Sequence, residues 1–145
     1  MIIHTIGFTR KSAEAFFSSL RAAGVRRVVD TRLYNTSQLS GFAKQDDLRY
    51  FLDKIASIEY RHEPLLAPTA DILEAYKKKT ISWKHYEEAY LALMQSRQIE
   101  SRMNREALSD ACLLCSEADP LHCHRRLAAE YLSDRWGDLQ IDHIR

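Results

Sequence analysis

The fold that we expect for this chain is decided by the stretch Ala111-Cys112-Leu113-Leu114-Cys115-Ser116-Glu117-Ala118-Asp119-Pro120-Leu121-His122-Cys123-His124-Arg125-Arg126. It begins as a short apolar run, continues as a polar turn with two acids and a proline, and ends where a new amphipathic pattern starts. An apolar strand, a turn and a helix start are the usual framework of a loop-borne site in an α/β protein. All three cysteines lie here, and Cys112, which alternates away from Cys115 along the strand, is expected in the core.

The rest of the chain repeats this alternation of strand and helix. Strand, helix and strand within about thirty residues have the length of a βαβ unit, whose two strands are parallel. Residues 69–107 are helical throughout and form an insertion between the third and fourth strands. We therefore predict one α/β domain over residues 1–145, with a mainly parallel sheet and flanking helices. The expected strands are 2–6, 25–29, 58–62, 111–115 and 139–144, and the expected helices begin at 13 and 46 and span 71–78, 82–96, 100–108 and 123–135. The helix that begins at 46 is expected to bury an apolar face of Leu48, Phe51, Leu52 and Ile55.

Composition and charge narrow the class of protein. Hydrophobic residues make up 46% of the chain and charged residues 28%, which is ordinary for a domain with a buried core. The formal net charge of +1 argues neither for nor against a polyanionic partner. Since the sequence contains no membrane-spanning apolar run and no signal peptide, we expect a cytoplasmic protein without a membrane partner. The odd count of three cysteines suggests free thiols in a reducing cytosol rather than a disulfide framework.

Three of the predicted strands end in residues that are suited to a site. The first ends at Thr5-Ile6-Gly7, the second at Asp30-Thr31-Arg32, and the fourth at Cys115-Ser116-Glu117. Ligands of an open parallel sheet bind beyond the carboxyl ends of its strands, so we expect these three segments to meet at one edge. A local ion pair between Asp30 and Arg32 is the alternative interpretation of the second segment.

Cys123 is the candidate nucleophile at this edge. It stands at a predicted helix N-terminus beside His124 and Arg125, and both the helix N-terminus and nearby cations favour a thiolate. The same N-terminus can hold an anion on its backbone N–H groups, to which Arg32 and Arg125 could add bidentate contacts. A buried, inert cysteine beside helix-capping residues is the alternative. The Cys-x5-Arg loop of the cysteine phosphatases is absent, because Arg125 follows only two residues after Cys123.

Carboxylates near the cysteines are candidates for proton transfer. Glu117 and Asp119 lie in the same turn, and Asp30 ends a neighbouring predicted strand. A carboxylate within reach of a substrate can act as a general acid or base. The alternative is that Asp119 and Pro120 only shape the turn and cap the next helix.

A metal site is a further alternative for this stretch. Zinc prefers cysteine and histidine ligands, and Cys115, His122, Cys123 and His124 are close in sequence, with His4 as a more distant donor. The chain has no Cys-x2-Cys pair, however, and adjacent residues seldom bind the same ion. The sequence therefore designates no metal ligands and leaves the cofactor unknown, with zinc or iron as the candidates.

Residues 76–86, Tyr-Lys-Lys-Lys-Thr-Ile-Ser-Trp-Lys-His-Tyr, combine aromatic rings with cations. This composition is typical of a nucleic-acid-binding surface, where bases stack on aromatic side chains. It is also typical of a solvated, lysine-rich helix end beside a buried tryptophan, which is the interpretation that we favour. The segment thus leaves a non-catalytic nucleic-acid-binding module open as a second function.

Several motifs carry a resemblance to a known family: Thr5-Ile6-Gly7, Asp30-Thr31-Arg32 with Ser37, Leu114-Cys115-Ser116-Glu117, Cys123-His124-Arg125 and His143-Ile144. Together they resemble the bacterial and archaeal domain-of-unknown-function family 488 over nearly the full chain. The resemblance implies a compact α/β protein whose motif residues cluster at one site. Phe8 and Thr9 stand where many members have His and Ser, Asn35 where many have Pro, and residues 65–67 replace Leu-Gly-Gly. These departures weaken a mechanism that uses an imidazole of the first loop, whereas the later motifs are intact.

We therefore predict a small cytosolic enzyme that acts on an anionic substrate, such as a nucleotide or a nucleic-acid end. The alternatives are a nucleic-acid-binding module and a metal-binding protein with Cys115 and Cys123 as ligands. The sequence does not indicate an oligomeric state. The predicted catalytic residues are Cys123, Glu117 and Asp30, and the predicted substrate-binding residues are Gly7, Arg32, Ser37, Cys115, His124 and Arg125.

Overall fold

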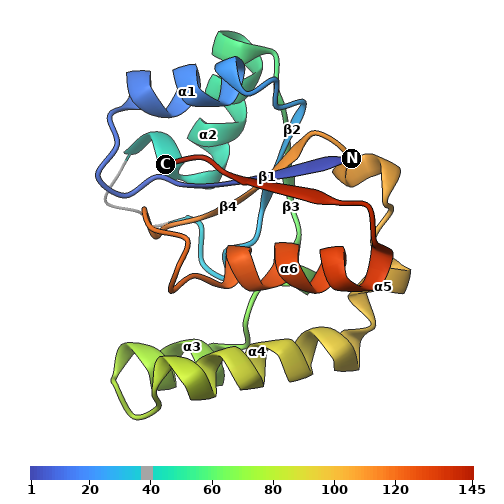
Figure 1. Cartoon of the computed structure of the whole chain (residues 1–145). Helices are drawn as coiled ribbons and strands as arrows, with labels where there is room; N and C mark the ends of the chain where they lie inside the picture. The colour runs from blue at the N-terminus through green and yellow to red at the C-terminus, as the bar shows by residue number, and fades with distance from the viewer. Residues whose placement is uncertain (37–40) are drawn as a thin grey trace.

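The computed structural model describes residues 1–36 and 41–145 and contains one five-stranded sheet (Figure 1). All neighbouring strands are parallel, in the order β3-β2-β4-β1-β5. The prediction of an α/β fold with a parallel sheet is therefore confirmed. Among the described helices, none is both long and apolar enough to cross a membrane. The strands are β1 (Ile2–Gly7), β2 (Arg27–Asp30), β3 (Glu59–His62), β4 (Ala111–Cys115) and β5 (Gln140–His143).

Helices cover both faces of the sheet (Figure 1). α1 and α2 lie on one face, whereas α6 lies on the other. The hairpin of α3 and α4 belongs to the predicted insertion, and it forms an outer layer because α4 packs on α6 rather than on the sheet. The helices are α1 (Ala13–Ala22), α2 (Gln45–Phe51), α3 (Ala70–Lys77), α4 (Trp83–Arg97), α5 (Ile99–Arg102) and α6 (His124–Trp136), with a π-helix at Leu52–Ala56 and 3-10 turns at Gly41–Ala43, Pro64–Leu66 and Glu106–Leu108.

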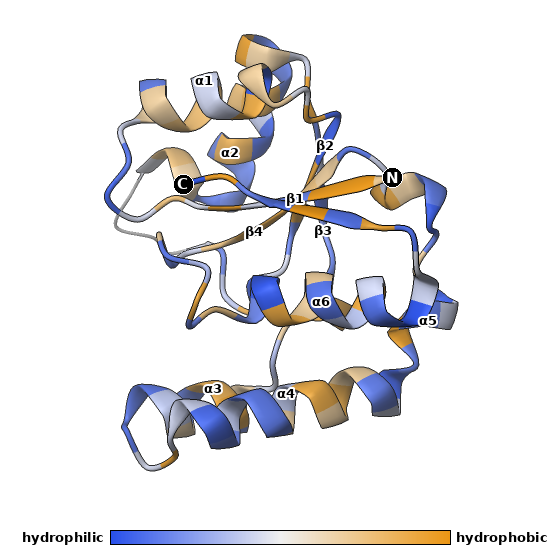
Figure 2. Cartoon of the chain, viewed as in Figure 1, coloured by the Kyte–Doolittle hydropathy of each residue, from blue (hydrophilic) through white to orange (hydrophobic). Residues whose placement is uncertain are grey.

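A hydrophobic core lies on each side of the sheet. Successive side chains of a strand point to opposite faces, so Leu113 joins the core under α6 and Leu114 the core under α1. Because helices cover both faces, all five residues of β4 are buried. Figure 2 shows the resulting hydrophobic character of β1 and β4. The buried strand β4 therefore fixes the position of Cys115, from which the chain continues toward α6.

Side-chain caps explain why three helices begin close to the predicted positions. The hydroxyl oxygens of Ser12, Thr69 and Ser82 each accept a hydrogen bond from the backbone N–H three residues further on. Such a cap satisfies an otherwise unpaired N–H group of the first helical turn. α3 and α4 lie within one residue of their predicted ends at both termini.

Two predicted helices differ from the structure. The helix that begins near residue 46 changes into a π-helix at Leu52–Ala56, whose wider turn rotates Ile55 away from the predicted apolar face. Ile55 is consequently 49% exposed, although it was expected to be buried. The helix predicted at 100–108 is divided into α5 and a 3-10 turn, because Asn104 Oδ1 accepts the backbone N–H groups of Glu106 and Ala107 and starts a new turn.

Candidate functional site

Three strand ends meet at one edge of the sheet, as the sequence predicts. Gly7 of β1 pairs with Cys115 of β4, and Asp30 of β2 pairs with Leu114 on the other side of β4. The segments that follow these residues therefore leave the sheet next to one another. The predicted substrate-binding residue Ser37 lies outside the described residues.

Gly7 is required by a close approach of the β4–α6 loop (residues 116–123). A Cβ atom at Gly7 would lie 1.6 Å from the carbonyl oxygen of Glu117. The same approach allows the backbone N–H of Thr9 to donate to the carbonyl oxygen of Ser116 at 3.0 Å. The absence of a side chain at Gly7 thus allows the β4–α6 loop to follow this path.

Asp30 and Arg32 form a buried ion pair at the end of β2. Arg32 donates from Nε and Nη2 to the two Asp30 carboxylate oxygens, each at 2.8 Å, and its guanidinium lies over the Phe8 ring. The Tyr60 hydroxyl donates to the same carboxylate at 2.6 Å. Burial alone would raise the pKa of Asp30, but its bonds to Arg32 and Tyr60 hold that pKa below its usual value. The alternative interpretation, a local ion pair between Asp30 and Arg32, is therefore what the structure shows. Because its pKa is lowered, the Asp30 carboxylate is a weak base.

Arg125 is fully buried and shapes the β4–α6 loop. Its Nη1 donates to the Cys115 sulfur at 3.2 Å and to the Glu117 carbonyl oxygen, while Nη2 donates to the Ala118 carbonyl oxygen at 3.2 Å. Burial lowers the pKa of Arg125 to about 10, so the guanidinium remains charged at neutral pH. Two nitrogens, Arg125 Nε and Arg32 Nη1, are buried without a hydrogen-bond partner among the described residues. Most N–H groups of Arg125 thus already donate hydrogen bonds to Cys115 and to the β4–α6 loop.

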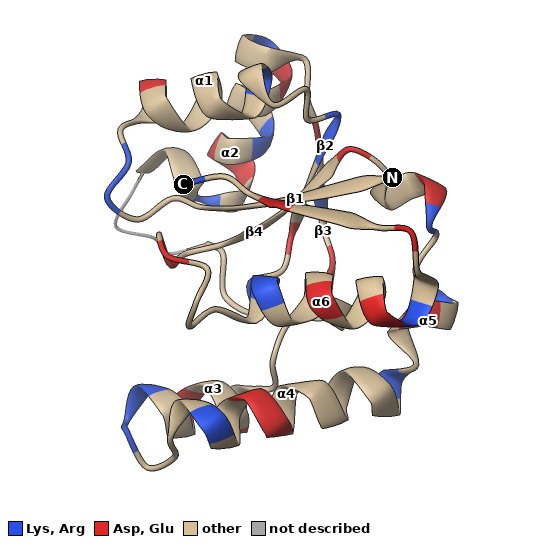
Figure 3. Ribbon diagram, viewed as in Figure 1, with Lys and Arg blue, Asp and Glu red and all other residues tan. Residues whose placement is uncertain are grey.

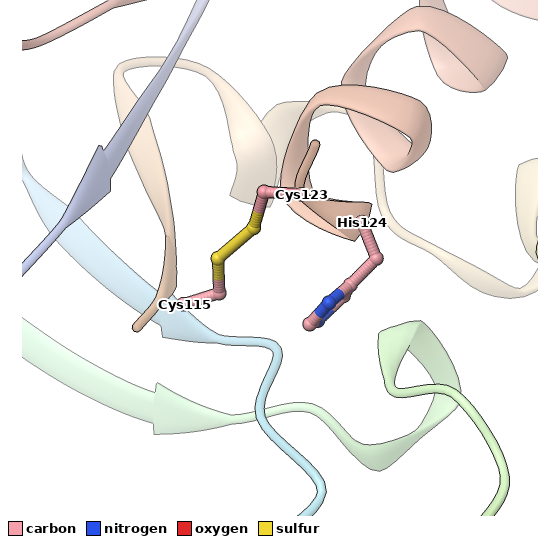
Figure 4. Close-up of side chains that lie close together, drawn as sticks. All are labelled: Cys115, Cys123 and His124. Atoms are coloured by element: carbon pink, nitrogen blue, oxygen red, sulfur yellow. A yellow bond between two sulfur atoms is a disulfide. The ribbon is translucent and has the colours of Figure 1, made fainter. Parts of the chain in front are cut away.

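Cys115 and Cys123 are joined by a disulfide (Figure 4). The expectation of free thiols is therefore wrong for these two residues, because the turn of the β4–α6 loop brings the end of β4 back against the start of α6. Cys123 is the extended N-cap residue of α6, directly before its first helical residue. Cys112 remains a free, buried thiol in the core, as expected.

His124 lies beside the disulfide in a fixed orientation (Figure 4). Its Nε2 is 2.8 Å from the Thr31 carbonyl oxygen, an acceptor, and 3.0 Å from Thr31 Oγ1, which donates its own hydrogen to the Leu114 carbonyl oxygen. Nε2 must therefore carry a hydrogen. Burial lowers the pKa of His124 to about 4, so the ring is neutral and its Nδ1 keeps a lone pair.

A cavity of about 410 Å³ opens next to the disulfide. Four predicted site residues line it, namely Cys115, Glu117, Cys123 and His124, whereas the remaining described ones, including Asp30, do not. The other wall comes from the helical insertion, which the sequence did not associate with this edge. The described lining residues of that wall are Leu73, Tyr76, Lys77, Lys79, Ile81, Ser82, Trp83 and Tyr86, and Ser116 and His122 complete the loop side.

Aromatic rings form a continuous part of this cavity wall. Trp83 stacks on His122 of the β4–α6 loop and on Tyr86, with ring centroids 5.0 Å apart in both pairs, and Tyr76 lies at 5.6 Å from Trp83. Lys77 is the last residue of α3, and Lys79 lies in the turn that follows. Both are exposed, and Figure 3 shows the positive charge at this end of the α3–α4 hairpin. The mixture of aromatics and lysines in residues 76–86 was the signal for these lining residues.

Comparisons with known proteins identify the family of the chain. The family model of the domain of unknown function DUF488 matches residues 12–132 of the 145 residues. This range contains Asp30, the disulfide and Arg125, whereas Gly7 lies before it. No curated protein and no solved structure gives a significant match. The match extends over most of the chain, and the protein therefore belongs to the DUF488 family.

Proposed function

We propose that this protein is an enzyme whose substrate is a small anionic compound with a planar ring, of the nucleotide class. The observation that supports the proposal is the cavity beside Cys115 and Cys123, which combines an aromatic wall, two lysines and the carboxylate of Glu117. Its volume of about 410 Å³ lies in the range that is typical of small-molecule sites. We assign the substrate to this cavity.

The two kinds of side chain in the wall suit two parts of such a compound. A flat ring gains stacking energy on an aromatic side chain, and the rings of Tyr76 and Trp83 line the cavity. A phosphate or carboxylate is attracted by the ammonium groups of Lys77 and Lys79 on the same wall. Arg32 and Arg125, the anion-binding residues predicted from the sequence, already bond to other groups of the protein, so we propose the lysines for this role instead.

The loop side of the cavity supplies the reactive groups. We propose that the active form is the one in which the Cys115–Cys123 disulfide has been reduced, as a reducing cytoplasm would favour. The position of Cys123 at the N-terminus of α6 then favours its thiolate. Glu117 is exposed, lines the cavity and is our candidate for proton transfer. Asp30 does not take this role, since it bonds to Arg32 outside the cavity lining.

Fluorescence titration tests the binding part of the proposal. Trp136→Phe leaves Trp83, in the cavity wall, as the only tryptophan, and its emission is followed while a nucleoside or the corresponding 5′-monophosphate is added. We expect both compounds to change the emission and the monophosphate to bind more tightly. Replacing both Lys77 and Lys79 by Gln should weaken only the monophosphate, by roughly twofold to thirtyfold, because each exposed ion pair contributes about 0.2–1 kcal/mol.

Lys78→Gln is the matched control for the lysine variants. Lys78 lies between the two cavity lysines but does not line the cavity, so its replacement should leave the affinity unchanged. An equal loss of monophosphate affinity in the Lys77/Lys79 double variant and in Lys78→Gln, or no binding of either compound, would contradict the proposal. If single-stranded oligonucleotides bind far more tightly and the affinity falls steeply with salt, the nucleic-acid-binding alternative is favoured instead.

The catalytic part has its own test. Compounds that bind are incubated with the reduced protein, and their conversion is followed by chromatography. Cys123→Ser should abolish conversion while the titration still shows binding, because a hydroxyl is a much weaker nucleophile than a thiolate. Full conversion by this variant would remove the thiol from the mechanism.

A further inference from the structure

We infer that Cys115, Cys123 and His124 form a binding site for one zinc-class divalent ion when the two cysteines are reduced. The inference does not rest on the proposed substrate, since it concerns three protein ligands and a metal ion alone. Cysteine sulfur and imidazole nitrogen are the donor atoms that zinc prefers in proteins.

The distances between the donor atoms support a shared ion. One ligand atom from each of Cys115, Cys123 and His124 lies within 4.8 Å of the others. A tetrahedral zinc ion with bonds of about 2.0–2.3 Å holds its ligand atoms roughly 3.3–3.8 Å apart. Once the sulfurs are no longer bonded to each other, we expect rotation of the three side chains to close this difference.

The backbone explains how two adjacent residues can bind the same ion. Adjacent residues seldom bind the same ion, and neighbouring side chains of a regular strand point in opposite directions. Cys123 is extended, with φ of −141° and ψ of 139°, whereas His124 is the first residue of α6. The chain changes direction between the two residues, and their side chains reach the same place (Figure 4).

His124 makes the hydrogen bond that is usual for a metal-binding histidine. Metal-bound imidazoles usually donate the hydrogen of their other ring nitrogen to a carbonyl or carboxylate oxygen. His124 Nε2 donates to the Thr31 carbonyl oxygen at 2.8 Å, which leaves Nδ1 as the nitrogen with a lone pair for the ion. Thr31 is itself held by its hydrogen bond to the Leu114 carbonyl oxygen, so the ring orientation is fixed before an ion binds.

The charges of the reduced site suit a buried divalent cation. Two thiolates and one neutral imidazole around a divalent ion carry no net charge, and uncharged groups are the least costly to bury. Cys115 and Cys123 are 2% and 3% exposed, respectively. The Arg125 guanidinium donates to the Cys115 sulfur at 3.2 Å, a contact that favours the thiolate over the thiol.

The disulfide and the metal complex are alternative states of the same two sulfurs. A dithiol reductant transfers two electrons to the Cys115–Cys123 bond, is itself oxidised to a disulfide, and leaves two thiols on the protein. Metal binding then releases two protons as the thiols become thiolates. Three protein ligands leave a fourth position of a tetrahedral ion on the cavity side, since all three residues line the cavity.

Metal analysis after reduction tests the inference. Protein purified without a metal-affinity tag is reduced with a dithiol, loaded with zinc, passed through a desalting column and analysed for bound metal. We expect about one equivalent of zinc per chain in the reduced protein and less than about a tenth of an equivalent in the oxidised protein, which has no thiolates to offer. His124→Gln and Cys123→Ser should lose the zinc in the presence of a competing chelator.

His122→Gln is the matched control, because His122 lies in the same loop but outside the ligand cluster. This variant should retain zinc. Alkylation of the reduced native protein with iodoacetamide provides a measurement that does not depend on folded variants: zinc should protect Cys115 and Cys123, as seen by mass spectrometry. Zinc below a tenth of an equivalent in the reduced protein, or equal retention by His124→Gln, would overturn the inference.

Discussion

Replacement of Asp30 by Asn is predicted to destabilise the protein strongly, because it leaves the Arg32 guanidinium buried without a counter-charge. Asp30 is fully buried, and Arg32 is 4% exposed. The Asp30 carboxylate accepts hydrogen bonds from Arg32, from the Tyr60 hydroxyl and from the Asn35 side chain. Removing one partner of a buried pair typically costs about 3–5 kcal/mol, a large part of the roughly 5–15 kcal/mol by which domains are stable.

The same strand provides a matched control for this substitution. Arg27 at the start of β2 donates to Glu59 of β3 from Nε at 3.0 Å and from Nη2 at 2.8 Å, but the Glu59 side chain is 67% exposed. Glu59→Gln should therefore cost only about 0–1 kcal/mol. Both free energies of unfolding are measured by circular dichroism in urea, which carries no charge and does not screen ion pairs. Equal costs for the two variants would refute the reasoning.

Two further measurements extend the test of Asp30. If Asp30→Asn alone does not fold, Asp30→Asn with Arg32→Met should recover stability, because the unpaired charge is removed as well. The pKa of Asp30 is lower in the folded protein than in the unfolded chain, so this carboxylate stabilises the fold above the unfolded pKa of about 3.9 and loses that effect as the pH falls through the folded value. The stability difference between native protein and Asp30→Asn should thus be constant near neutral pH and narrow below about pH 4.

Two further substitutions test how the β4–α6 loop is held. Gly7→Ala places a Cβ atom against the Glu117 carbonyl oxygen and should cost about 1–3 kcal/mol in urea denaturation, whereas Gly41→Ala, where the new atom has open space, should stay within about 0.5 kcal/mol. Arg125→Lys keeps the charge but cannot supply the same set of hydrogen bonds. It should lower the melting temperature by roughly 4–10 °C, from a loss of about 1.5–3 kcal/mol, and an unchanged melting temperature would show that the guanidinium does not hold the loop.

The parallel sheet was predictable because its signal is local. The apolar run Ala111–Cys115 predicts a buried strand by itself, and the polar caps at Ser12 and Ser82 mark helix starts within a few residues. The π-helix at Leu52–Ala56 was not predictable, since its residues continue the apolar spacing of an α-helix and only packing selects the wider turn. Patterns thus locate the elements, whereas the exact turn depends on neighbouring side chains.

The position of site residues was predictable, but their partners were not. Parallel strands bring Gly7, Asp30 and Cys115 to one edge by topology alone. Which of the charged groups face an open space depends on hydrogen bonds between residues far apart in the chain. Arg125, for example, is an apparent anion ligand by residue type, yet its donors are bonded to carbonyl oxygens of the loop. Topology therefore predicted the edge at which these residues lie, whereas the hydrogen-bond partners of Arg125 could not be predicted from the sequence.

The helical insertion forms the second wall of the cavity, which the strand-end motifs do not predict. An open edge of a parallel sheet is a shallow surface, and a small compound needs a second wall. α4 packs on α6, and this contact brings Trp83 at the start of α4 against His122 of the β4–α6 loop. The stack connects the insertion to the loop that carries both cysteines. A change in the insertion should consequently alter the surroundings of Cys123 although the two are far apart in sequence, and the specificity of the site is expected to reside in residues 76–86 rather than in the strand-end motifs.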